Sequence, residues 1–552
     1  MKRIADDCTK QLYRCCYLHF VTRIERPVLE SFASMLLAGN AVAQVVKIFD
    51  EYLDMISLEP TLFTLNIKNS FEAYNNPAHT ELQIRSFMNR VAMGLLSAIR
   101  IMGIIPIIRA PTGGAAEMLA RDFSSLLHEN LTPRGAAYQL LSGALITDRP
   151  RPLMLIFDRT CDLSTSAMHT STYQSLIDDL LDHKLNRVTI ESSKGSAEKK
   201  KTYDLNTQND LFFSKYAGTC SLSLDYSLYS KYSLGAPFPA AVEANEKELS
   251  EISAKEAEIR SRPGEALTGD IDSREKELNS AIESLPELLA RKANLEAHTN
   301  ILQATMKHIA AREVPTYFDI EQSILSAGRV NDKAAVLGLL RDGSKGTLLD
   351  KARLLVVVAA LASSERAEDY DAAFTAGCTA MNPAATPKQI EEALNAVKFI
   401  RRLIALQNPI SQRLSAMKSS QIHVGLSSII SSAHLGASSL MAKAALLFAK
   451  FTPFYITRVV DNLAEGRPCT EDDSFCTIDP RSPDSIPEKG ARYSEVIVFV
   501  LGGGTYGEYD NLQELLKQKA SGGALRSIAY GCSELTSGDE FFNQLIGLGN
   551  AG

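Results

Sequence analysis

The chain has 552 residues, of which 45% are hydrophobic and 22% are charged, an ordinary composition for a globular protein of about three or four domains. Its 58 basic and 65 acidic residues give a formal net charge of -7, which argues against a nucleic-acid-binding face and against attraction of the whole chain to anionic lipid. Nine scattered cysteines form no CxxC pair, so reduced cytosolic thiols are expected rather than a zinc site or a redox dithiol. The first ten residues lack the apolar core of a signal peptide, and the most apolar stretches are too short to span a bilayer. Any membrane role is therefore expected to work through a partner.

Helical periodicity covers residues 28–56, where Gly39-Asn40 marks a break between two predicted helices. From about 86 to 190 the pattern alternates between helices and strands. The helices are predicted at 88–99, 115–128 and 173–183, and the strands at 104–108 and 153–157. Strands that alternate with helices are typical of a parallel or mostly parallel sheet, so we expect an α/β domain here.

Residues 238–326 differ in character. Val242, Leu249, Ile252 and Ile259 share one heptad face, while the other faces are highly charged. Glycine and proline break the pattern at 261–272, and a second helical stretch follows, in which Pro286 marks a kink or a restart. The sequence therefore predicts a long helical hairpin. Its charged surface is either a solvated face or a docking surface for partner helices, and the pattern does not decide between the two.

The last third of the chain contains the strongest predicted strand. Residues 327–450 are predicted to be mostly helical, and the acidic, proline-rich stretch at 465–490 is predicted to be a loop. Residues 495–501 (EVIVFVL) then form an almost wholly apolar strand without a long helical partner of their own. We expect this strand to join the sheet begun at 104–157, which makes that domain discontinuous.

Two groups of residues at strand ends have the composition of reactive sites. The Gly502–Gly504 run lacks the Lys of a phosphate loop and the spacing of a dinucleotide fingerprint, so a tight turn is expected rather than nucleotide binding. Asp158 and Asp162 could serve acid–base or metal chemistry. Because Arg159 lies between them and favours their ionised forms, we expect an ion-paired loop that orients the next helix.

The histidines give no sign of a catalytic or metal site. They form no Cys/His cluster, and no GxSxG elbow is present. His169, His183, His298 and His308 are therefore expected to be hydrogen-bonded structural residues. The sequence indicates no catalytic, cofactor-binding or metal-binding residues.

Four segments, in order along the chain, are distinctive. They are Ile107-Ile108-Arg109 with GGAAEMLA; LIFDRTCDLSTSAMHTSTYQSLIDDLLDHKLNRV at 155–188; SLPELLARKANLEAHTNI at 284–301; and EVIVFVLGGGTYGEYDNL with IAYGCSEL at 495–512 and 528–535. Together they resemble the SM (Sec/Munc) family of SNARE-binding proteins, and specifically its ER–Golgi branch, the Sly proteins.

The resemblance implies an arch-shaped α/β plus α fold, with two parallel-sheet α/β domains and a large, mostly helical domain that carries the hairpin. It divides the chain into domain 1 at 1–53, the first segment of domain 2 at 54–216, domain 3 at 217–464 with the hairpin at about 238–326, and the second segment of domain 2 at 465–552.

The resemblance also implies a regulator without a cofactor, not an enzyme. Such a protein binds a syntaxin-type Qa-SNARE, an R-SNARE and assembled SNARE bundles, and templates or proofreads bundle assembly in ER–Golgi docking and fusion. It is expected to be a cytoplasmic monomer, peripheral on ER and Golgi membranes through its partners alone, with no nucleic-acid partner. An enzyme that uses the α/β domain and a generic helical scaffold or tether are the alternatives.

Two SNARE sites follow from the resemblance. An N-terminal peptide of the Qa-SNARE is expected to dock on two adjacent helices of domain 1, at Leu29, Phe32, Ala33, Val45 and Ile48, with Glu51 nearby. The R-SNARE is expected on the second hairpin helix, at Leu285, Leu288, Lys292 and Leu295, continuing to Tyr317, with Lys292 paired to acidic SNARE residues. The alternative for the first set is that its apolar residues are core. The alternative for Leu288 and Leu295 is that they only pack against the first hairpin helix.

The sequence departs from the family pattern in two places. Family members begin with a strand-rich half of domain 1, which is not found here because the chain starts directly in a predicted helix. The helices at 10–56 are then expected to leave an apolar patch larger than soluble monomers normally show, and the native product is expected to be longer at its N-terminus. Residues 218–235 resemble an insertion between DLFFSKY and APFPAAVE.

Overall fold

The computed structural model describes residues 1–551 except for 23, 132–140, 142–149, 193–198, 206–209, 217–236, 262–270, 363–364, 416–451, 468–472, 483–489 and 520–524. In several helical stretches, including 258–261, 271–285 and 407–415, it describes the backbone but not the side chains. The expected insertion at 218–235 lies outside the described residues.

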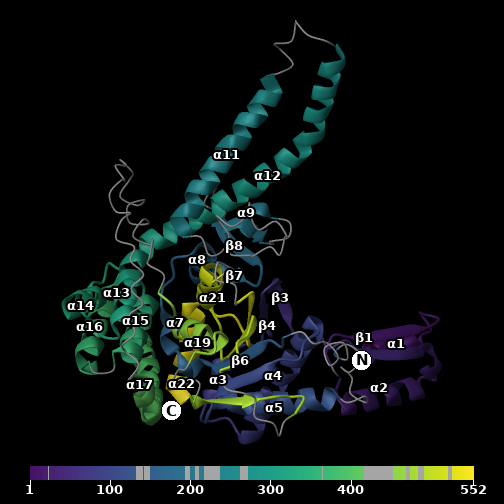
Figure 1. Ribbon diagram of the computed structural model, residues 1–552, viewed down its shortest axis with the longest axis horizontal. Coiled ribbons are helices and arrows are strands. Elements are labelled where there is room, and N and C mark those ends of the chain that lie inside the picture. The colour runs from purple at the N-terminus through teal and green to yellow at the C-terminus, as the bar shows by residue number, and fades with distance from the viewer. Residues whose placement is uncertain are drawn as a thin grey trace.

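A seven-stranded sheet forms the centre of the molecule (Figure 1). Its strands, in spatial order, are β10 (Phe475–Ile478), β5 (Ile107–Pro111), β6 (Leu153–Asp158), β11 (Glu495–Leu501), β12 (Ser527–Cys532), β4 (Leu62–Thr64) and β3 (Ile56–Glu59). The inner strands are parallel, and only the edge strands β10 and β3 pair antiparallel. The predicted strand at 495–501 pairs with β6 on one side and β12 on the other, so its expected place in the sheet is confirmed.

Helices cover both faces of this sheet because its inner strands are apolar on both sides. In β11, Ile497 and Phe499 face a core shared with α4 (Glu81–Met102) and α5 (Ala115–Asn130). The alternate residues Val496 and Val498 face a second core shared with α19 (Tyr455–Ala464) and α21 (Tyr506–Lys519). This period of two within one buried strand separates the cores into two layers.

A helical region packs beside the sheet. It comprises α13 (Val314–Ala327), α14 (Lys333–Arg341), α15 (Leu348–Leu361), α16 (Ala367–Ala380) and α17 (Pro387–Ser415), and its core takes in residues of α22 (Gly538–Ala551), α3 (Ser70–Asn75) and α7 (Leu163–Ala167). Helix α15 (LLDKARLLVVVAAL) is buried over most of its length, including its charged residues Asp350, Lys351 and Arg353, and lies at the centre of this region.

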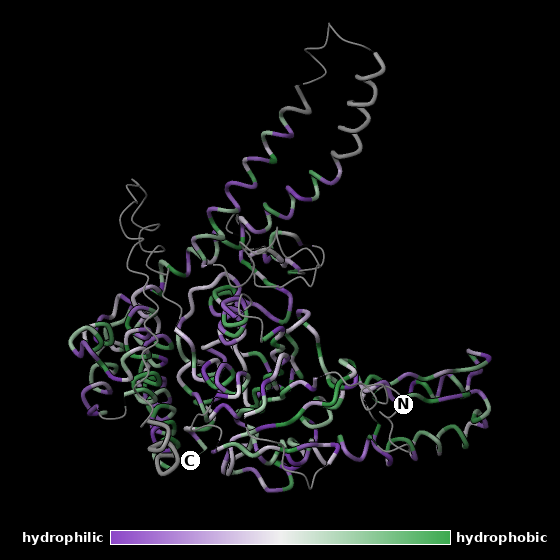
Figure 2. Tube along the Cα trace, viewed as in Figure 1, coloured by the Kyte–Doolittle hydropathy of each residue, from purple (hydrophilic) through white to green (hydrophobic). Residues whose placement is uncertain are grey.

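The predicted hairpin is present. Helices α11 (Phe238–Ser261) and α12 (Ile271–Arg312) pack on each other and project from the body (Figure 1). Pro286 lies inside α12, which continues through it, so the alternative of a helix restart is wrong. Both helices carry mixed polar and apolar residues along the projection (Figure 2). The base packs on α8 (Tyr173–Leu180) and α9 (Leu211–Tyr216), and a small antiparallel sheet lies nearby, formed by β7 (Asp182–Lys184), β8 (Arg187–Ser192) and β9 (Lys199–Asp204).

The N-terminal unit (residues 1–53) projects on the side of the body away from the helical region (Figure 1). It contains α1 (Lys2–Thr9), β1 (Cys16–Phe20), α2 (Arg26–Ala38), the short 3₁₀ helix η1 (Val42–Gln44) and β2 (Val45–Asp50). The two strands form a parallel pair.

Three sequence predictions are wrong. The stretch 10–56, expected to be helical, contains the strand β1 at Cys16–Phe20. The second helix predicted in 28–56 is instead β2, which contains the β-branched residues Val45, Val46 and Ile48 and pairs its backbone with β1. Its six residues are too few to separate a period of 3.6 from a period of two. The loop predicted at 465–490 contains β10, whose four residues at a sheet edge leave too short a pattern to recognise.

Candidate functional site

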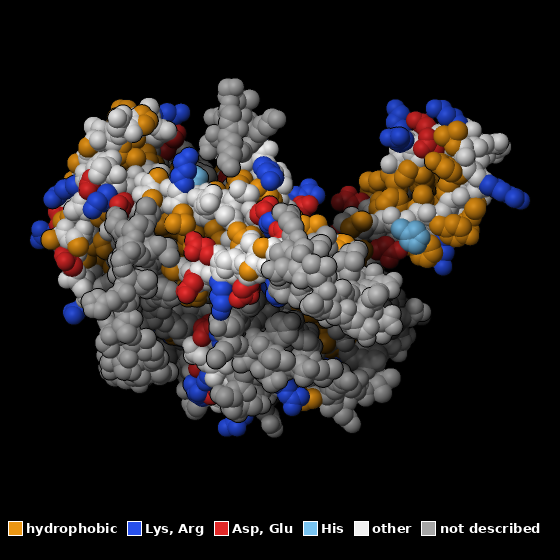
Figure 3. Space-filling view, turned by 90° about the horizontal axis from the view of Figure 1, so that it is seen from above, with side chains coloured by type: hydrophobic (Ala, Val, Ile, Leu, Met, Phe, Trp, Pro, Cys, Tyr) orange, Lys and Arg blue, Asp and Glu red, His pale blue; other side chains and the backbone are white. Residues whose placement is uncertain are grey.

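The N-terminal unit has a small core and an exposed apolar surface. Helices α1 and α2 pack on one face of the β1–β2 pair through Phe32, Leu36 and Cys8. The other face is open, and Figure 3 shows hydrophobic side chains gathered on this unit. Its exposed large apolar residues are Leu12, Tyr13, Tyr17, Val21, Val28, Leu37, Val42, Val46, Ile48 and Leu53. Exposed apolar surface of this kind marks interaction sites. The size expected for the patch stays a prediction.

The apolar residues predicted for the SNARE N-peptide lie on α2 and β2, and Glu51 directly follows β2, so the expected pair of adjacent helices is wrong. Phe32 is 1% exposed and belongs to the core. Leu29 and Val45 are half-buried, whereas Ala33, Ile48 and Glu51 are exposed.

A polar edge borders this apolar surface. The His19 ring stacks on Phe49 with ring centroids 4.5 Å apart, and its Nδ1 lies 2.5 Å from the Glu51 carboxylate. The Lys47 ammonium lies 4.8 Å from the centre of the same Phe49 ring. Sequence reasoning missed His19 and Phe49, because the strand pairing that brings them together was not predicted.

The base of the hairpin is a mixed apolar and polar core. Val242 and Ile252 of α11 and Leu295 of α12 are buried with α8 and α9, so the predicted apolar stripe faces inward here. Farther out, Arg291 Nη2 lies 2.8 Å from Glu248, and Lys292 Nζ lies 2.5 Å from Glu256. Ion pairs between the two helices therefore accompany the apolar contacts.

The residues predicted for the R-SNARE face divide into different environments. Leu295 and Tyr317 are buried at 1% and 0% exposure, and the Tyr317 hydroxyl donates to the Lys345 carbonyl at 3.2 Å. Leu288 is half-buried, and Lys292 pairs with α11 instead of facing solvent freely. The geometry of this face therefore favours packing against α11. The side chain of Leu285 lies outside the described residues.

A flank of α12, about a quarter to a third of a turn from Leu288 and Leu295, is open. Leu289 is 48% exposed, and Ala293, Glu296 and Asn300 follow it at helical spacing and are exposed too. We call these four residues the outer strip. The sequence alone allows this strip, because its four residues repeat at the same helical spacing as the predicted face that begins at Leu288. Heptad counting does not tell which of the two faces meets α11.

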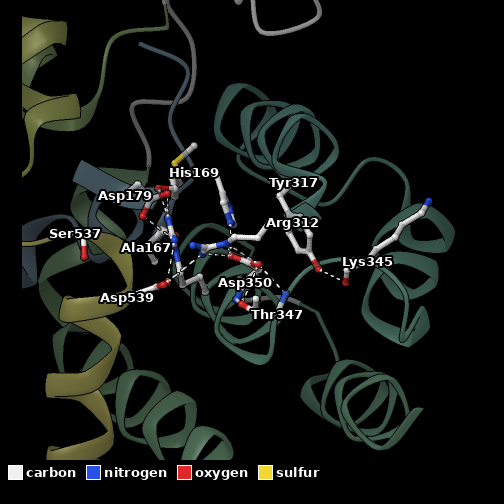
Figure 4. Close-up of polar contacts among 12 residues, drawn as sticks. Ala167, His169, Asp179, Arg312, Tyr317, Lys345, Thr347, Asp350, Ser537 and Asp539 are labelled. Carbon is white, nitrogen blue, oxygen red and sulfur yellow. Dashed lines mark hydrogen bonds and ion pairs between the residues drawn. The ribbon is translucent and has the colours of Figure 1, made fainter. Parts of the chain in front are cut away.

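A buried charged cluster joins the hairpin to the body (Figure 4). Arg312, in the last turn of α12, binds Asp350 of α15, with Nε 3.1 Å from each carboxylate oxygen. Asp350 also contacts His169 Nε2 at 3.1 Å, and His169 Nδ1 lies 2.8 Å from Glu321 of α13. The side chains of His169, Glu321 and Asp350 are fully buried.

A second arginine extends this cluster to the sheet segments. Arg353 Nη1 lies 2.8 Å from Asp179 and 3.2 Å from Asp539, the first-turn carboxylate of α22. Arg353 also donates to the backbone carbonyls of Ala167 and Met168. Asp539 in turn lies 3.3 Å from Arg312, so one carboxylate is shared by both arginines.

These contacts fix the charges in the cluster. Burial lowers the pKa of His169, but the charge of Glu321 and the hydrogen bonds to Asp350 and Glu321 outweigh burial and raise the pKa to about 9. Burial raises the pKa of Asp350, but His169 and Arg312 hold it well below its usual range. At neutral pH the imidazole is therefore a cation between two carboxylates.

The glycine run forms a turn whose backbone groups are hydrogen-bonded by the side chains of Ser533 and Arg159. Gly502 and Gly503 have φ of 91° and 108°, which favour glycine, and their amides donate to Ser533 Oγ at 2.9 and 3.3 Å. Arg159 Nε donates to the Gly503 carbonyl at 2.9 Å. The predicted tight turn is confirmed.

The neighbouring carboxylates cap short helices. Asp158 accepts from the Thr160 amide at 2.9 Å in the 3₁₀ helix η2 (Arg159–Cys161), and Asp162 accepts from the Thr165 amide at 3.1 Å at the start of α7. The loop therefore orients the next helix, as expected. The expected ion pairing is wrong, because Arg159 turns inward to Glu508 of α21, with Nη2 and Oε2 2.6 Å apart, and burial raises the pKa of Asp158.

The histidine predictions are confirmed for three residues. His169 lies in the charged cluster, His183 Nδ1 contacts Asp178 at 2.9 Å, and His298 lies between Tyr173 and Asp210. The hydrogen bond of His308 stays a prediction. Within the described ranges, no three His, Cys, Asp or Glu side chains are grouped to hold a metal ion. Of the helices that the structure describes, none has the length and apolar character needed to cross a membrane.

Comparisons with known proteins match nearly the full length of the chain. The chain is 35% identical over 582 residues to the rat Sec1 family domain-containing protein 1, covering 99% of this chain and 85% of that protein. It is 30% identical over 575 residues to protein sly1 of Schizosaccharomyces pombe, covering 99% of this chain and 84% of that protein. A crystal structure of Sly1p in complex with an N-terminal peptide of Sed5p matches 100% of this chain and 82% of that chain, with a TM-score of 0.69 at 24% identity. A structure of Vps45 in complex with the Qa SNARE Tlg2 (1-310) matches 99% of this chain and 84% of that chain, with a TM-score of 0.64 at 16% identity. Both structures have the same fold as this chain.

The family model described as the Sec1 family matches residues 1–220 and 222–544. This match spans almost the whole chain and agrees with relatives at 30% identity or more. The chain belongs to the Sec1 family.

Proposed function

We propose that this chain is a SNARE-binding regulator of vesicle docking and fusion in ER–Golgi transport, which binds a syntaxin-type Qa-SNARE and templates or proofreads assembly of the SNARE bundle. The observation that carries the proposal is the full-length match to Sec1-family relatives that include Sly1 proteins. Solved structures of similar fold hold an N-terminal peptide of Sed5p on Sly1p and the Qa SNARE Tlg2 on Vps45. The proposal includes action as a cytoplasmic monomer that reaches ER and Golgi membranes through its partners.

The proposal assigns Qa-SNARE N-peptide binding to the N-terminal unit. The exposed residues Ile48, Ala33 and Glu51, together with half-buried Leu29 and Val45, offer apolar contacts beside one carboxylate. A short peptide needs only one or two apolar anchors and a few polar contacts to bind such a surface. The four-part division at 1–53, 54–216, 217–464 and 465–552 is part of this proposal. The burial of α19 against the sheet supports a start of the last segment near 455 instead of 465.

The proposal assigns R-SNARE contact to the hairpin, on the outer strip of α12. SNARE motifs are amphipathic helices, and a partner helix can lay its apolar face along exposed small and apolar residues. Leu289 supplies an apolar contact, Ala293 permits close approach, and Glu296 adds a charge beside them. Holding two SNARE helices in register lowers the entropy cost of their encounter, which is how a rigid projection would speed bundle assembly.

The proposed role is not enzymatic. The amides of Gly502 and Gly503 and the carboxylates of Asp158 and Asp162 are already used in internal hydrogen bonds. A nucleotide would have to displace Ser533 and Arg159 to reach this turn. We expect no ATP or GTP hydrolysis by the purified protein, measured as phosphate release.

The hairpin assignment is tested by replacing Leu289 with Asp and following SNARE-bundle assembly by fluorescence energy transfer. A charge on the outer strip should slow assembly and weaken R-SNARE capture. The matched control is Leu406→Asp, which places the same charge on a side chain that is 78% exposed on α17, away from the hairpin. Equal assembly rates for Leu289→Asp and Leu406→Asp would move the R-SNARE site away from this strip.

A further inference from the structure

Helix α12 is held at two buried polar contacts near its inner end. At the first contact, His298 Nδ1 lies 2.8 Å from the Tyr173 hydroxyl, and its Nε2 lies 2.7 Å from Asp210. At the second, Arg312 binds Asp350 and Asp539. At 1.5 Å per residue, the two contacts are about 21 Å apart along the helix. The apolar residues Ile301, Leu302 and Ile309 also pack this stretch into the core at the hairpin base. The two polar contacts add directional restraints at its two ends, and loss of one weakens the restraint on the direction of the helix.

The two contacts connect α12 to different parts of the chain. Tyr173 belongs to α8 and Asp210 precedes α9, both before the hairpin in sequence. Asp350 belongs to α15, and Asp539 lies in the first turn of α22, at the other end of the chain. The second contact therefore links the hairpin to the C-terminal segment that also supplies β11 and β12 to the sheet.

The geometry of the second contact is restrictive. The Arg312 side chain is only 11% exposed, and the Asp350 side chain is 0% exposed. Asp350 is itself held by His169 and by the Thr347 amide, which donates to it at 2.7 Å. A buried ion pair is favourable only while its hydrogen bonds are well aligned, so a small shift of the helix end is opposed.

The outer part of the hairpin amplifies such a shift. Arg291 and Lys292 of α12 pair with Glu248 and Glu256 of α11, which makes the two helices move together. For a straight helix, Ile271 lies about 40 Å beyond His298, roughly twice the distance from His298 to Arg312. A displacement at Arg312 is therefore roughly doubled at the tip when His298 acts as the pivot.

We propose that His298 and Arg312 are positioning residues: His298 is the pivot of the hairpin, and the Arg312–Asp350–Asp539 contact sets the direction in which the outer strip faces a SNARE helix. Through Asp539, the C-terminal segment that supplies β11 and β12 contacts Arg312 directly and so restrains the direction of the hairpin. The link to SNARE assembly rests on the proposed function, whereas the mechanical role does not.

The mechanical role is tested by electron–electron spin distance measurements on the full chain. Spin labels are introduced as non-natural amino acids, because nine native cysteines preclude thiol labelling. One label replaces Ala257, an exposed residue of α11 well beyond the level of His298, and the other replaces Leu82, which is 77% exposed on α4. The variants are Arg312→Gln, which removes the charge, and Arg312→Lys, which keeps it. Asp539→Asn is a milder variant, because Asp539 is already 28% exposed.

The matched control is Arg401→Gln. Arg401 makes a two-pronged pair with Asp371 at 2.7 and 2.8 Å between α17 and α16, in the same helical region but away from the hairpin. We expect Arg312→Gln to broaden and shift the Ala257–Leu82 distance distribution, with Arg312→Lys and Asp539→Asn intermediate. Arg401→Gln should leave the distribution unchanged even if it lowers the melting temperature.

Each outcome decides one part of the proposal. An unchanged distribution in folded Arg312→Gln overturns the mechanical role, and if that variant does not fold, an unchanged distribution in Asp539→Asn does so. A broadened distribution with a several-fold slower SNARE assembly supports both parts. A broadened distribution with unchanged assembly keeps the mechanical role and overturns its link to SNARE assembly. Loss of syntaxin-type SNARE binding by the wild-type protein would instead count against the proposed function.

Discussion

The Nε atom of Arg312 lies 3.1 Å from both carboxylate oxygens of Asp350, at the point where the hairpin enters the helical region. The same carboxylate contacts His169 from the segment between α7 and α8. One buried anion thus joins three parts of the chain that are more than 30 residues apart in sequence. This contact is the basis for regarding the hairpin as a directed projection instead of a loosely attached arm.

The charged state of His169 predicts a pH dependence of stability. Its pKa in the folded protein is about 9, above its ordinary value of 6.5. Its stabilising contribution is therefore complete below about pH 6.5 and is lost as the pH rises through about 9. Within that window each pH unit lowers the free energy of unfolding by up to about 1.4 kcal/mol. Urea unfolding of the wild type and of His169→Gln between pH 6 and 10 measures this, and a wild-type advantage that does not shrink with rising pH would contradict it.

The burial of Leu295 predicts its effect on stability. Leu295 is 1% exposed in the core at the hairpin base, so Leu295→Ala should lower the free energy of unfolding by about 2–5 kcal/mol through lost burial and a residual cavity. Leu289→Ala, on the same helix but 48% exposed, should change it by less than about 0.5 kcal/mol. Denaturant unfolding measures both, and similar losses for the two variants would contradict the assignment of inner and outer faces.

Two glycines of the helical region predict opposite effects of alanine. A Cβ at Gly377 of α16 would lie 1.9 Å from the Leu340 carbonyl oxygen, so Gly377→Ala should force α14 and α16 apart and cost about 1–3 kcal/mol. A Cβ at Gly338 of α14 would meet nothing within 4 Å, so Gly338→Ala should stabilise the helix by about 0.5–1 kcal/mol. Melting temperatures of the two variants that move in the same direction would be inconsistent with this packing.

The prediction for the N-terminal unit concerns peptide binding. Leu29→Arg should abolish binding of a syntaxin-type N-terminal peptide without unfolding the protein, because Leu29 is only half-buried and a charge can reach solvent there. Leu37→Arg is the control, since Leu37 is 69% exposed on the same helix and is not among the predicted contact residues. Calorimetric titration measures the affinity. An affinity of Leu29→Arg equal to that of Leu37→Arg would place the site elsewhere.

The sequence predicts the parts of this fold whose patterns are long. The apolar run at 495–501 could be assigned to a distant sheet because a strand without a local partner must find one elsewhere, and β11 lies between β6 and β12. The hairpin followed from its periodicity and its central break. By contrast, the sequence predicts a helix where β2 lies, because its pairing with β1 is a tertiary contact that six residues do not encode.

The candidate site was harder to predict for the same reason. Helical spacing placed Leu288, Lys292 and Leu295 on one face, but only the position of α11 tells that this face is turned inward. Nothing in the spacing of His169 and Arg312 indicates that they share Asp350, because all three lie on different segments. Arg159 illustrates the opposite error, since its sequence neighbours suggested a pairing that its distant contact with Glu508 replaces.

The most direct test of the account is a calorimetric titration of the full chain with the cytoplasmic region of a syntaxin-type Qa-SNARE of the ER–Golgi route, and with the same region lacking its N-terminal peptide. We expect saturable binding of the complete SNARE region, weakened by loss of the peptide and by Leu29→Arg. Absence of binding by a protein whose circular dichroism and cooperative melting show it to be folded would contradict the account.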